Sequence, residues 1–129
     1  MSERIGRSDV EAWLAGYERA WRTPGTASLG ELFTADATYR QAPFEQPRAG
    51  LAAIAEMWEA EREGPDEAFR MQIGIVALDG NTCVVRVNVS YGSGSPAEYR
   101  DLWVIRFGED RRCDAFEEWP FWPGQPLTP

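Results

Sequence analysis

The stretch YRDLWVIRFGEDRRCDAFEEW, residues 99–119, decides the fold because it reads as two β-strands joined by a short turn. Side chains two apart in a strand share a face, so Asp101 shares one with Tyr99 and Trp103. Glu118 lies in the second strand, two residues after a phenylalanine. A carboxylate among aromatic residues is paired, exposed at a rim, or held at a shifted pKa for chemistry. The stretch therefore predicts a sheet and a candidate site together.

Further strands are expected on the N-terminal side of this stretch, at residues 69–78 and 82–91. They flank Asp79-Gly80-Asn81, which favours a hairpin because Gly and Asn tolerate positive φ. With strands at 98–107 and 112–119, the C-terminal half predicts an antiparallel meander.

The N-terminal half favours helices. Trp13, Tyr17 and Trp21 recur every four residues, and Ser8–Glu11 has the capping-box spacing, so we expect a helix over residues 9–22. A short second helix is expected after Ser28, which precedes Glu31 at the same spacing, then an extended piece at 37–41. A third helix is expected from Gly50 to Gly64-Pro65. Helical elements followed by a meander make an α+β plan.

Length and composition limit the function classes. The 129 residues predict a single domain, residues 1–129, and no apolar run is long enough for a membrane span. A formal charge of −8 argues against nucleic-acid binding, and the absence of histidine removes the commonest general base and the usual zinc ligand. We therefore expect no metal and no cofactor. The N-terminus lacks a secretory-signal pattern, so the expected location is cytoplasmic.

Two local features allow more than one interpretation. Cys83 and Cys113 are read as reduced thiols, with a disulfide as the alternative. The Pro-rich tail, residues 120–129, has prolines every three residues, the period of polyproline II. It is either an exposed recognition peptide or a segment that packs Phe121 and Trp122 on the domain, and packing is the interpretation we prefer.

Several motifs together resemble one superfamily. They are Ala20-Trp21 near the end of the first helix, Leu32-Phe33-Thr-Ala-Asp36-Ala-Thr-Tyr39, a Pro-containing loop, Pro47-Arg48-Ala-Gly50 before a helix, and Trp103-Val-Ile-Arg-Phe107. Over residues 9–119 this succession resembles the nuclear transport factor 2-like superfamily. That group includes SnoaL-like polyketide cyclases, ketosteroid isomerase-like proteins and limonene-epoxide hydrolases.

The resemblance implies a cone: a strongly curved antiparallel or mixed sheet wrapped around three N-terminal helices, the cystatin-like α+β roll. It further implies a mostly apolar pocket at the open end, with working groups on the inner face of the sheet and on the first helix. The implied partners are a small apolar or aromatic ligand and a second copy, bound through the sheet as a homodimer. The implied activity is that of an isomerase, hydrolase or cyclase, although fold alone does not fix function.

The resemblance to ketosteroid isomerases is incomplete at the catalytic positions. Tyr17 falls at the position of the oxyanion tyrosine, but Gln41-Ala42 stands around the place of the catalytic aspartate. Trp103 stands at the place of a second aspartate. Without the base, isomerisation next to a carbonyl cannot run by that mechanism, so that activity is not carried over.

On the same alignment, Arg86 and Asn88 join Asp101 and Glu118 on the inner face. Arg86 would pair with one carboxylate, while the other would have a raised pKa and act as acid or base. Tyr17 would donate a hydrogen bond to a ligand oxygen. The remaining expected ligand contacts are aromatic: Trp21, Phe33, Tyr39, Trp58, Tyr99, Trp103 and Phe116.

Two other interpretations remain open. The charged residues form a closed salt-bridge network, or the faces are reversed, so that Val85, Val87 and Leu102 are core and the polar residues contact solvent or a dimer partner. The chain would then be a non-catalytic ligand-binding or homodimeric assembly module.

Overall fold

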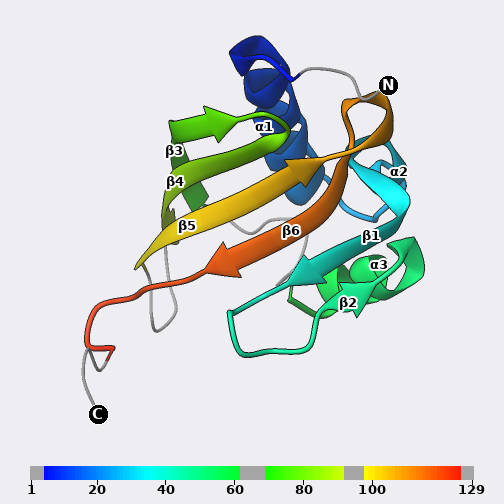
Figure 1. Cartoon of the computed structure of the whole chain (residues 1–129). Coiled ribbons are helices and arrows are strands. Elements are labelled where there is room, and N and C mark those ends of the chain that lie inside the picture. The colour runs from blue at the N-terminus through cyan, green and yellow to red at the C-terminus, as the bar shows by residue number, and fades with distance from the viewer. Residues whose placement is uncertain (1–4, 62–68, 92–97, 126–129) are drawn as a thin grey trace.

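The computed structural model describes residues 5–61, 69–91 and 98–125, and it confirms the expected α+β class (Figure 1). The elements in chain order are α1 (Arg7–Arg22), α2 (Leu29–Leu32), β1 (Phe33–Arg40), β2 (Arg48–Ala49), α3 (Leu51–Glu61), β3 (Phe69–Asp79), β4 (Thr82–Tyr91), β5 (Glu98–Phe107), a 3-10 turn (Glu109–Arg111) and β6 (Cys113–Trp119). In this described part of the chain, no helix has the length and apolar character needed to cross a bilayer.

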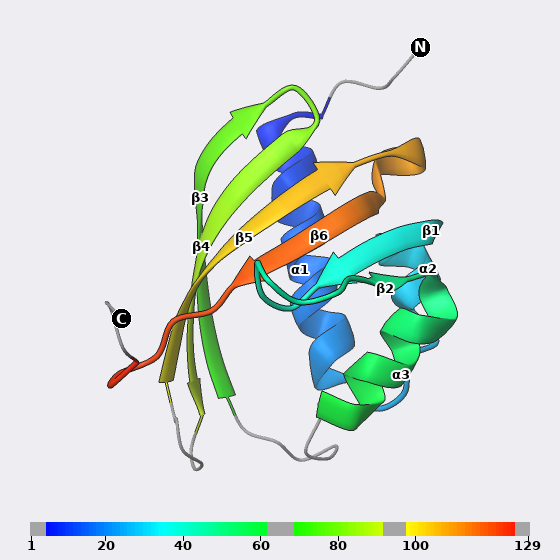
Figure 2. The same ribbon diagram turned by 60° about the horizontal axis from the view of Figure 1, so that its bottom comes forward.

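The strands form one mixed sheet in the order β2-β1-β6-β5-β4-β3. The expected meander is confirmed, because β3, β4, β5 and β6 pair antiparallel in sequence. β1 joins β6 in parallel and holds the short β2 at its other edge. The sheet curves around α1, with α2 and α3 beside its β1 end, and it does not close into a barrel (Figures 1 and 2).

The hydrogen-bond register shows which residues face the helices. Val85 lies opposite Trp103, which lies opposite Glu118, and residues directly opposite in neighbouring strands share a face. The inner face is nearly fully buried and comprises Cys83, Val85, Val87, Val89, Asp101, Trp103, Ile105, Phe107 and Phe116. It belongs to a single core shared with α1, α2 and α3.

The predicted inner position of Arg86 and Asn88 is wrong. Arg86 lies opposite Leu102 on the outer face and its side chain is exposed. The period of a strand is two, so a wrong choice of face moves every side chain to the other side. The core takes the valines of β4 because they form an unbroken apolar set, whereas the alternate positions include charged and polar residues.

Some element boundaries differ from the predictions. α1 begins at Arg7, and the carboxylate of Asp9 accepts a 2.9 Å hydrogen bond from the Gly6 N–H; a capping box at Ser8–Glu11 is therefore wrong. β1 starts directly after α2 and is longer than the expected segment 37–41. The expected helix end at Gly64-Pro65 lies outside the described residues.

The hairpin and the cysteines agree with the sequence interpretation. β3 ends at Asp79 and β4 begins at Thr82, with Gly80 at φ +60° in the turn. Both cysteines are free and buried.

The described part of the tail packs partly on the sheet. The Arg100 N–H donates to the Phe121 carbonyl at 2.9 Å, and the Trp122 ring meets Tyr99 at 6.1 Å. Phe121 and Trp122 nevertheless stay 44% and 39% exposed. Packing therefore covers each ring only in part, and the last prolines of the repeat, at 126 and 129, lie outside the described residues.

Candidate functional site

A chain of two tyrosine hydroxyls leads from α1 to a carboxyl group on β6. The hydroxyls of Tyr17 and Tyr39 are 2.8 Å apart, and Tyr39 donates to Oε1 of Glu118 at 2.6 Å. Because the Tyr39 proton is directed at the carboxylate, Tyr17 donates to Tyr39. The parallel pairing of β1 with β6 places Tyr39 beside this end of β6.

The environment of Glu118 disfavours its charged form. Burial raises its pKa to about 8, and the negative charges of Asp101, Glu61 and Glu45 act in the same direction. The hydrogen bond from Tyr39 opposes this but does not outweigh burial. Glu118 is therefore mostly protonated at neutral pH.

The second carboxyl group, that of Asp101, is only 7% exposed. Burial raises its pKa to about 6, while the N–H groups of Trp103 and Phe121 lower it by a smaller amount. Its buried Oδ1 and the buried Nε1–H of Trp103 both lack a close hydrogen-bond partner among the described residues. A buried donor and a buried acceptor without close partners are costly, so the two together mark a position for a polar ligand group or a solvent molecule.

The register places the two carboxyl groups near each other. Glu118 lies directly opposite Trp103, and Asp101 is two residues away on the same face, so the two acids are diagonal neighbours. Diagonal pairs in antiparallel strands have their backbones about 7–8 Å apart, with side chains able to approach more closely. The two carboxyl groups therefore share one region of the inner face.

The aromatic residues expected at the site are brought together. Tyr17 lies 4.7 Å from Trp103 and stacks on Phe116 at 5.7 Å, measured between ring centroids. Tyr39 also stacks on Phe116, at 4.5 Å between ring centroids. The same cluster includes Trp58, Phe33 and Trp21. These rings pack tightly enough to fix the tyrosine hydroxyls in place.

Tyr99 lies at the edge of this cluster. It shares the face of Asp101 on β5, and its ring meets those of Tyr91 and Trp122, each at 6.1 Å. Burial raises the pKa of Tyr99, and the charges of Asp101 and Glu61 add to this effect.

The expected pairing of Arg86 with an acid is wrong, because its guanidinium is on the opposite face. Asn88 lies on that outer face too, opposite Arg100 of β5. In the parts of the chain that the structure describes, no ion pair involves Asp101 or Glu118. The two acids therefore have raised pKa values because nothing basic compensates for their burial.

The SnoaL-like domain model matches residues 5–115. The chain belongs to the SnoaL-like family. No curated protein matches the chain.

Solved structures similar to this SnoaL-like chain share its fold at low identity. A candidate polyketide cyclase from Sinorhizobium meliloti has 20% identity and a TM-score of 0.66, with 88% of this chain and 99% of that chain covered. A steroid delta-isomerase from Pseudomonas aeruginosa has 22% identity and a TM-score of 0.64, covering 89% and 81%. The epoxide hydrolase/cyclase-like enzyme SalBIII, of pyran ring formation in the polyether salinomycin, has 17% identity and a TM-score of 0.70, covering 89% and 92%.

The SnoaL-like chain has site features that its sequence did not reveal. Glu45, in the loop after β1, and Glu61, at the end of α3, are exposed, and their negative charges still raise the pKa of Glu118. The bond from Tyr39 to Glu118 spans 79 positions. Only the tertiary arrangement brings these residues together, and no local sequence pattern predicts their proximity.

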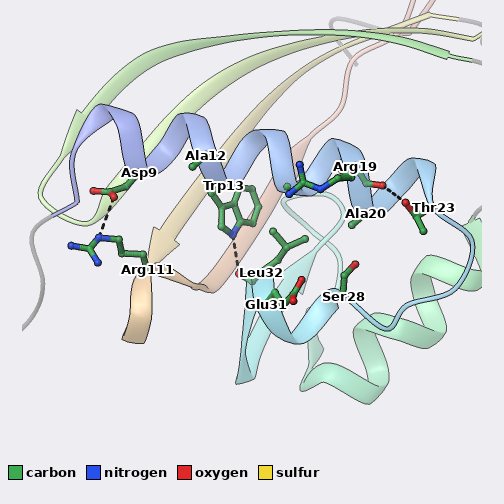
Figure 3. Close-up of a pocket in the computed structure, with 11 residues that line it drawn as sticks. Asp9, Ala12, Trp13, Arg19, Ala20, Thr23, Ser28, Glu31, Leu32 and Arg111 are labelled. Atoms are coloured by element: carbon green, nitrogen blue, oxygen red, sulfur yellow. Dashed lines mark hydrogen bonds and ion pairs between the residues drawn. The ribbon is translucent and has the colours of Figure 1, made fainter.

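Two grooves of this SnoaL-like domain lie away from the acids. One, of about 440 Å³, lies between α1 and α2, where Trp13 donates to the Leu32 carbonyl and Arg111 pairs with Asp9 (Figure 3). The other, of about 360 Å³, lies between the start of β5 and the tail, at Arg100 and Trp122. Neither groove is lined by Tyr17, Tyr39 or Glu118, which form the hydrogen-bonded chain, or by Asp101.

Proposed function

We propose that this SnoaL-like protein is a small-molecule enzyme that uses two carboxyl groups for acid–base chemistry on a small, largely apolar cyclic substrate. The observation that carries the proposal is the pair Asp101 and Glu118, which share a buried face and have pKa values of about 6 and about 8. At neutral pH Asp101 is mostly ionised and can act as base, while Glu118 is mostly protonated and can act as acid.

The tyrosine chain orients the acid. With Oε1 of Glu118 accepting from Tyr39, the carboxyl proton belongs on Oε2, where it is available to a substrate oxygen. Tyr17 positions Tyr39 in turn. Tyr39 is therefore a positioning residue for the acid, and Glu118 and Asp101 are the groups proposed to touch the substrate.

The pair can accept one proton at Asp101 and donate one at Glu118 in the same reaction, so the proposed chemistry needs no cofactor. Asp101 takes a proton from water or from a substrate hydroxyl, the freed oxygen attacks a carbon, and Glu118 gives its proton to the oxygen that leaves. Hydrolysis of a cyclic ether and closure of a new ring follow the same scheme. In an isomerisation, Asp101 instead removes a C–H proton while Glu118 protonates the developing enolate oxygen; Asp101 then returns its proton to a second carbon as the enol gives its proton back to Glu118. The steroid isomerase and epoxide hydrolase/cyclase-like neighbours make these the reaction classes to test first.

The test measures turnover of two simple probes, cyclohexene oxide for hydrolysis and cyclohex-3-enone for isomerisation. Asp101→Asn and Glu118→Gln should each lower kcat/KM by about 10² to 10⁴. Glu117→Gln is the matched control, since that side chain lies next in sequence but pairs with Arg40 at 3.5 Å. The wild-type rate should follow a bell-shaped pH profile with limits near about 6 and about 8.

Two outcomes contradict the proposal. One is turnover of neither probe by the wild type. The other is a rate that Asp101→Asn and Glu118→Gln leave unchanged, since the acids would then be structural only.

A homodimer through the outer face of the sheet is a second proposal for this chain. Leu102 and Val104 of β5 point to that face, and Trp119 beside them is 40% exposed. Apolar side chains on the face away from the helices favour a covering partner. Sedimentation over a range of concentrations tests it: association that Trp119→Glu abolishes supports the interface, and a strict monomer contradicts it.

A further inference from the structure

Trp103 differs from two other tryptophans of the chain in the bonding of its indole N–H. The N–H of Trp13 donates to the Leu32 carbonyl at 2.8 Å. That of Trp119 donates to the carboxylate of Glu117. Trp103 is 3% exposed, and its N–H has no close acceptor among the described residues. Because a buried tryptophan N–H normally finds a partner, this one requires an acceptor.

The indole of Trp103 is held in place by its neighbours. The ring centroid of Tyr17 lies 4.7 Å from that of Trp103, and the ring centroid of Phe116 lies 5.0 Å from it. Val85, which is fully buried, lies opposite Trp103 on β4. In a core packed this closely, the indole cannot turn its N–H toward solvent. The group that completes the N–H must therefore come to the place where the N–H points.

An acceptor that is short of a donor lies beside this N–H. Asp101 is 7% exposed and precedes Trp103 by two residues on the same face of β5. The N–H is near enough to lower the pKa of the Asp101 carboxyl group, yet no close hydrogen bond joins it to Oδ1. A buried donor and a buried acceptor are therefore neighbours, and each is short of one close partner.

One type of group completes both atoms at once. A carboxylate oxygen only accepts and an indole N–H only donates, so that group must donate to Asp101 and accept from Trp103. A carbonyl oxygen satisfies only the indole, and an ammonium group satisfies only the carboxylate. A hydroxyl oxygen does both and keeps a second lone pair free. The two atoms therefore select an O–H group, either a water molecule or an alcohol of the ligand.

We propose that Trp103 and Asp101 together hold the nucleophile of this site, an O–H group of water or of the substrate, whose oxygen accepts from the indole N–H. This inference rests on the proposed function, because it names the nucleophile of the same reaction. With an epoxide as substrate, Asp101 takes the proton of the O–H group and the oxygen lone pair forms the new C–O bond. The epoxide C–O bond breaks as Glu118 protonates its oxygen. Exchange with solvent then removes the proton from Asp101 and restores that of Glu118.

The arrangement favours attack by oxygen over removal of a C–H proton. An O–H group bonded to Oδ1 of Asp101 occupies the position that a substrate C–H would have to reach. The N–H of Trp103 stabilises an oxygen at that position and gives a carbon no comparable interaction. Trp103 therefore determines a preference for hydrolysis and ring closure over isomerisation.

A high-resolution crystal structure tests the position directly. The wild type is compared with a variant that carries β-(3-benzothienyl)alanine in place of Trp103, a residue of nearly the same shape in which sulfur replaces the N–H. The wild type should show an ordered oxygen about 2.7–3.2 Å from both Nε1 of Trp103 and Oδ1 of Asp101, and the variant should lose it. A direct bond from the indole to Oδ1, with no oxygen between the two atoms, overturns the inference.

Turnover of cyclohexene oxide tests the role of the N–H in the reaction. The benzothienyl variant at position 103 should lower kcat about tenfold with little change in KM, because the N–H contacts the nucleophile and not the epoxide. The same replacement of Trp13 is the matched control, since it removes an N–H that donates to the Leu32 carbonyl. It should lower stability by about 1 kcal/mol and leave kcat unchanged.

The epoxide 4,5-epoxypentan-1-ol distinguishes the two sources of the O–H group. Opening by its own hydroxyl gives tetrahydrofurfuryl alcohol, and opening by water gives pentane-1,2,5-triol. Whichever product dominates should decrease in the benzothienyl variant at position 103. An unchanged rate of both products in that variant overturns the inference.

The failure of this inference is distinguishable from the failure of the proposed function. A wild type that isomerises cyclohex-3-enone through both acids but opens neither epoxide keeps the proposed function and overturns the nucleophile held by Trp103. Turnover of no probe contradicts the proposed function, whereas an ordered oxygen bonded to both Trp103 and Asp101 still supports the O–H position.

Discussion

Replacing Glu118 by Gln should stabilise the protein at high pH and leave its stability unchanged at low pH. Gln has the shape of the protonated acid and keeps an oxygen to accept the hydrogen bond from Tyr39. The pKa of Glu118 is about 8 in the folded protein and 4.5 in an ordinary glutamate. Below pH 4.5 the side chain is protonated whether the chain is folded or not, so the variant gains nothing there.

The size of the stability gain follows from the difference between the pKa of Glu118 in the folded protein and that of an ordinary glutamate. The folded state holds the Glu118 proton more tightly than the unfolded state, so wild-type stability falls as the pH rises from 4.5 to about 8. At about 1.4 kcal/mol per pH unit, the complete loss would approach about 5 kcal/mol. Solvent reaches part of the side chain and screens its charge, so we expect a gain of about 2–3 kcal/mol at about pH 8.5.

Urea unfolding followed by tryptophan fluorescence at about pH 4, 6 and 8.5 measures the difference in free energy of unfolding. At about pH 8.5 Asp101, whose pKa is about 6, is ionised in both folded proteins. Glu117→Gln removes a partly exposed pair with Arg40 and should change stability by less than about 1 kcal/mol. Wild type and Glu118→Gln curves that run parallel at every pH would refute the assignment of a raised pKa to Glu118.

Three further predictions test the surroundings of the site. Tyr39→Phe removes the hydrogen bond that lowers the pKa of Glu118, so that pKa should rise further in an NMR titration, with a stability loss of about 1 kcal/mol in urea; an unchanged pKa counts against the bond. Phe116→Ala removes a ring stacked on Tyr17 and Tyr39 and should cost about 3–5 kcal/mol of unfolding free energy, whereas less than 1 would mean that the cluster is loosely packed. Arg86→Ala should change stability by no more than about 0.5 kcal/mol and leave probe turnover unaltered, because the side chain is exposed on the outer face; a large loss of turnover would return Arg86 to the site.

The sequence predicted β5 better than β4. In β5 the large apolar residues Trp103, Ile105 and Phe107 alternate with smaller or charged ones, so the inner face, and Asp101 with it, could be assigned. In β4 the alignment placed Arg86 and Asn88 on the inner face, against the alternation of the valines. Its valines, read on their own, would have identified the buried face.

The remaining features of the site depend on long-range pairing. Tyr39 reaches Glu118 because β1 joins β6 in parallel, a pairing between segments far apart that leaves no mark in local periodicity. The charges of Glu45 and Glu61 act on Glu118 for the same reason, although each lies in a segment that reads as surface. Residue types were therefore predictable, and their proximity was not.

The central claim is that Asp101 and Glu118 form an acid–base pair whose pKa values are separated by their surroundings. A pH titration of carboxyl ¹³C signals measures this directly, with Asp101→Asn and Glu118→Gln assigning the resonances. The account predicts that the pair titrates with apparent pKa values near about 6 and about 8. Two carboxyl groups that both titrate below about 5, as ordinary aspartate and glutamate do, would contradict it.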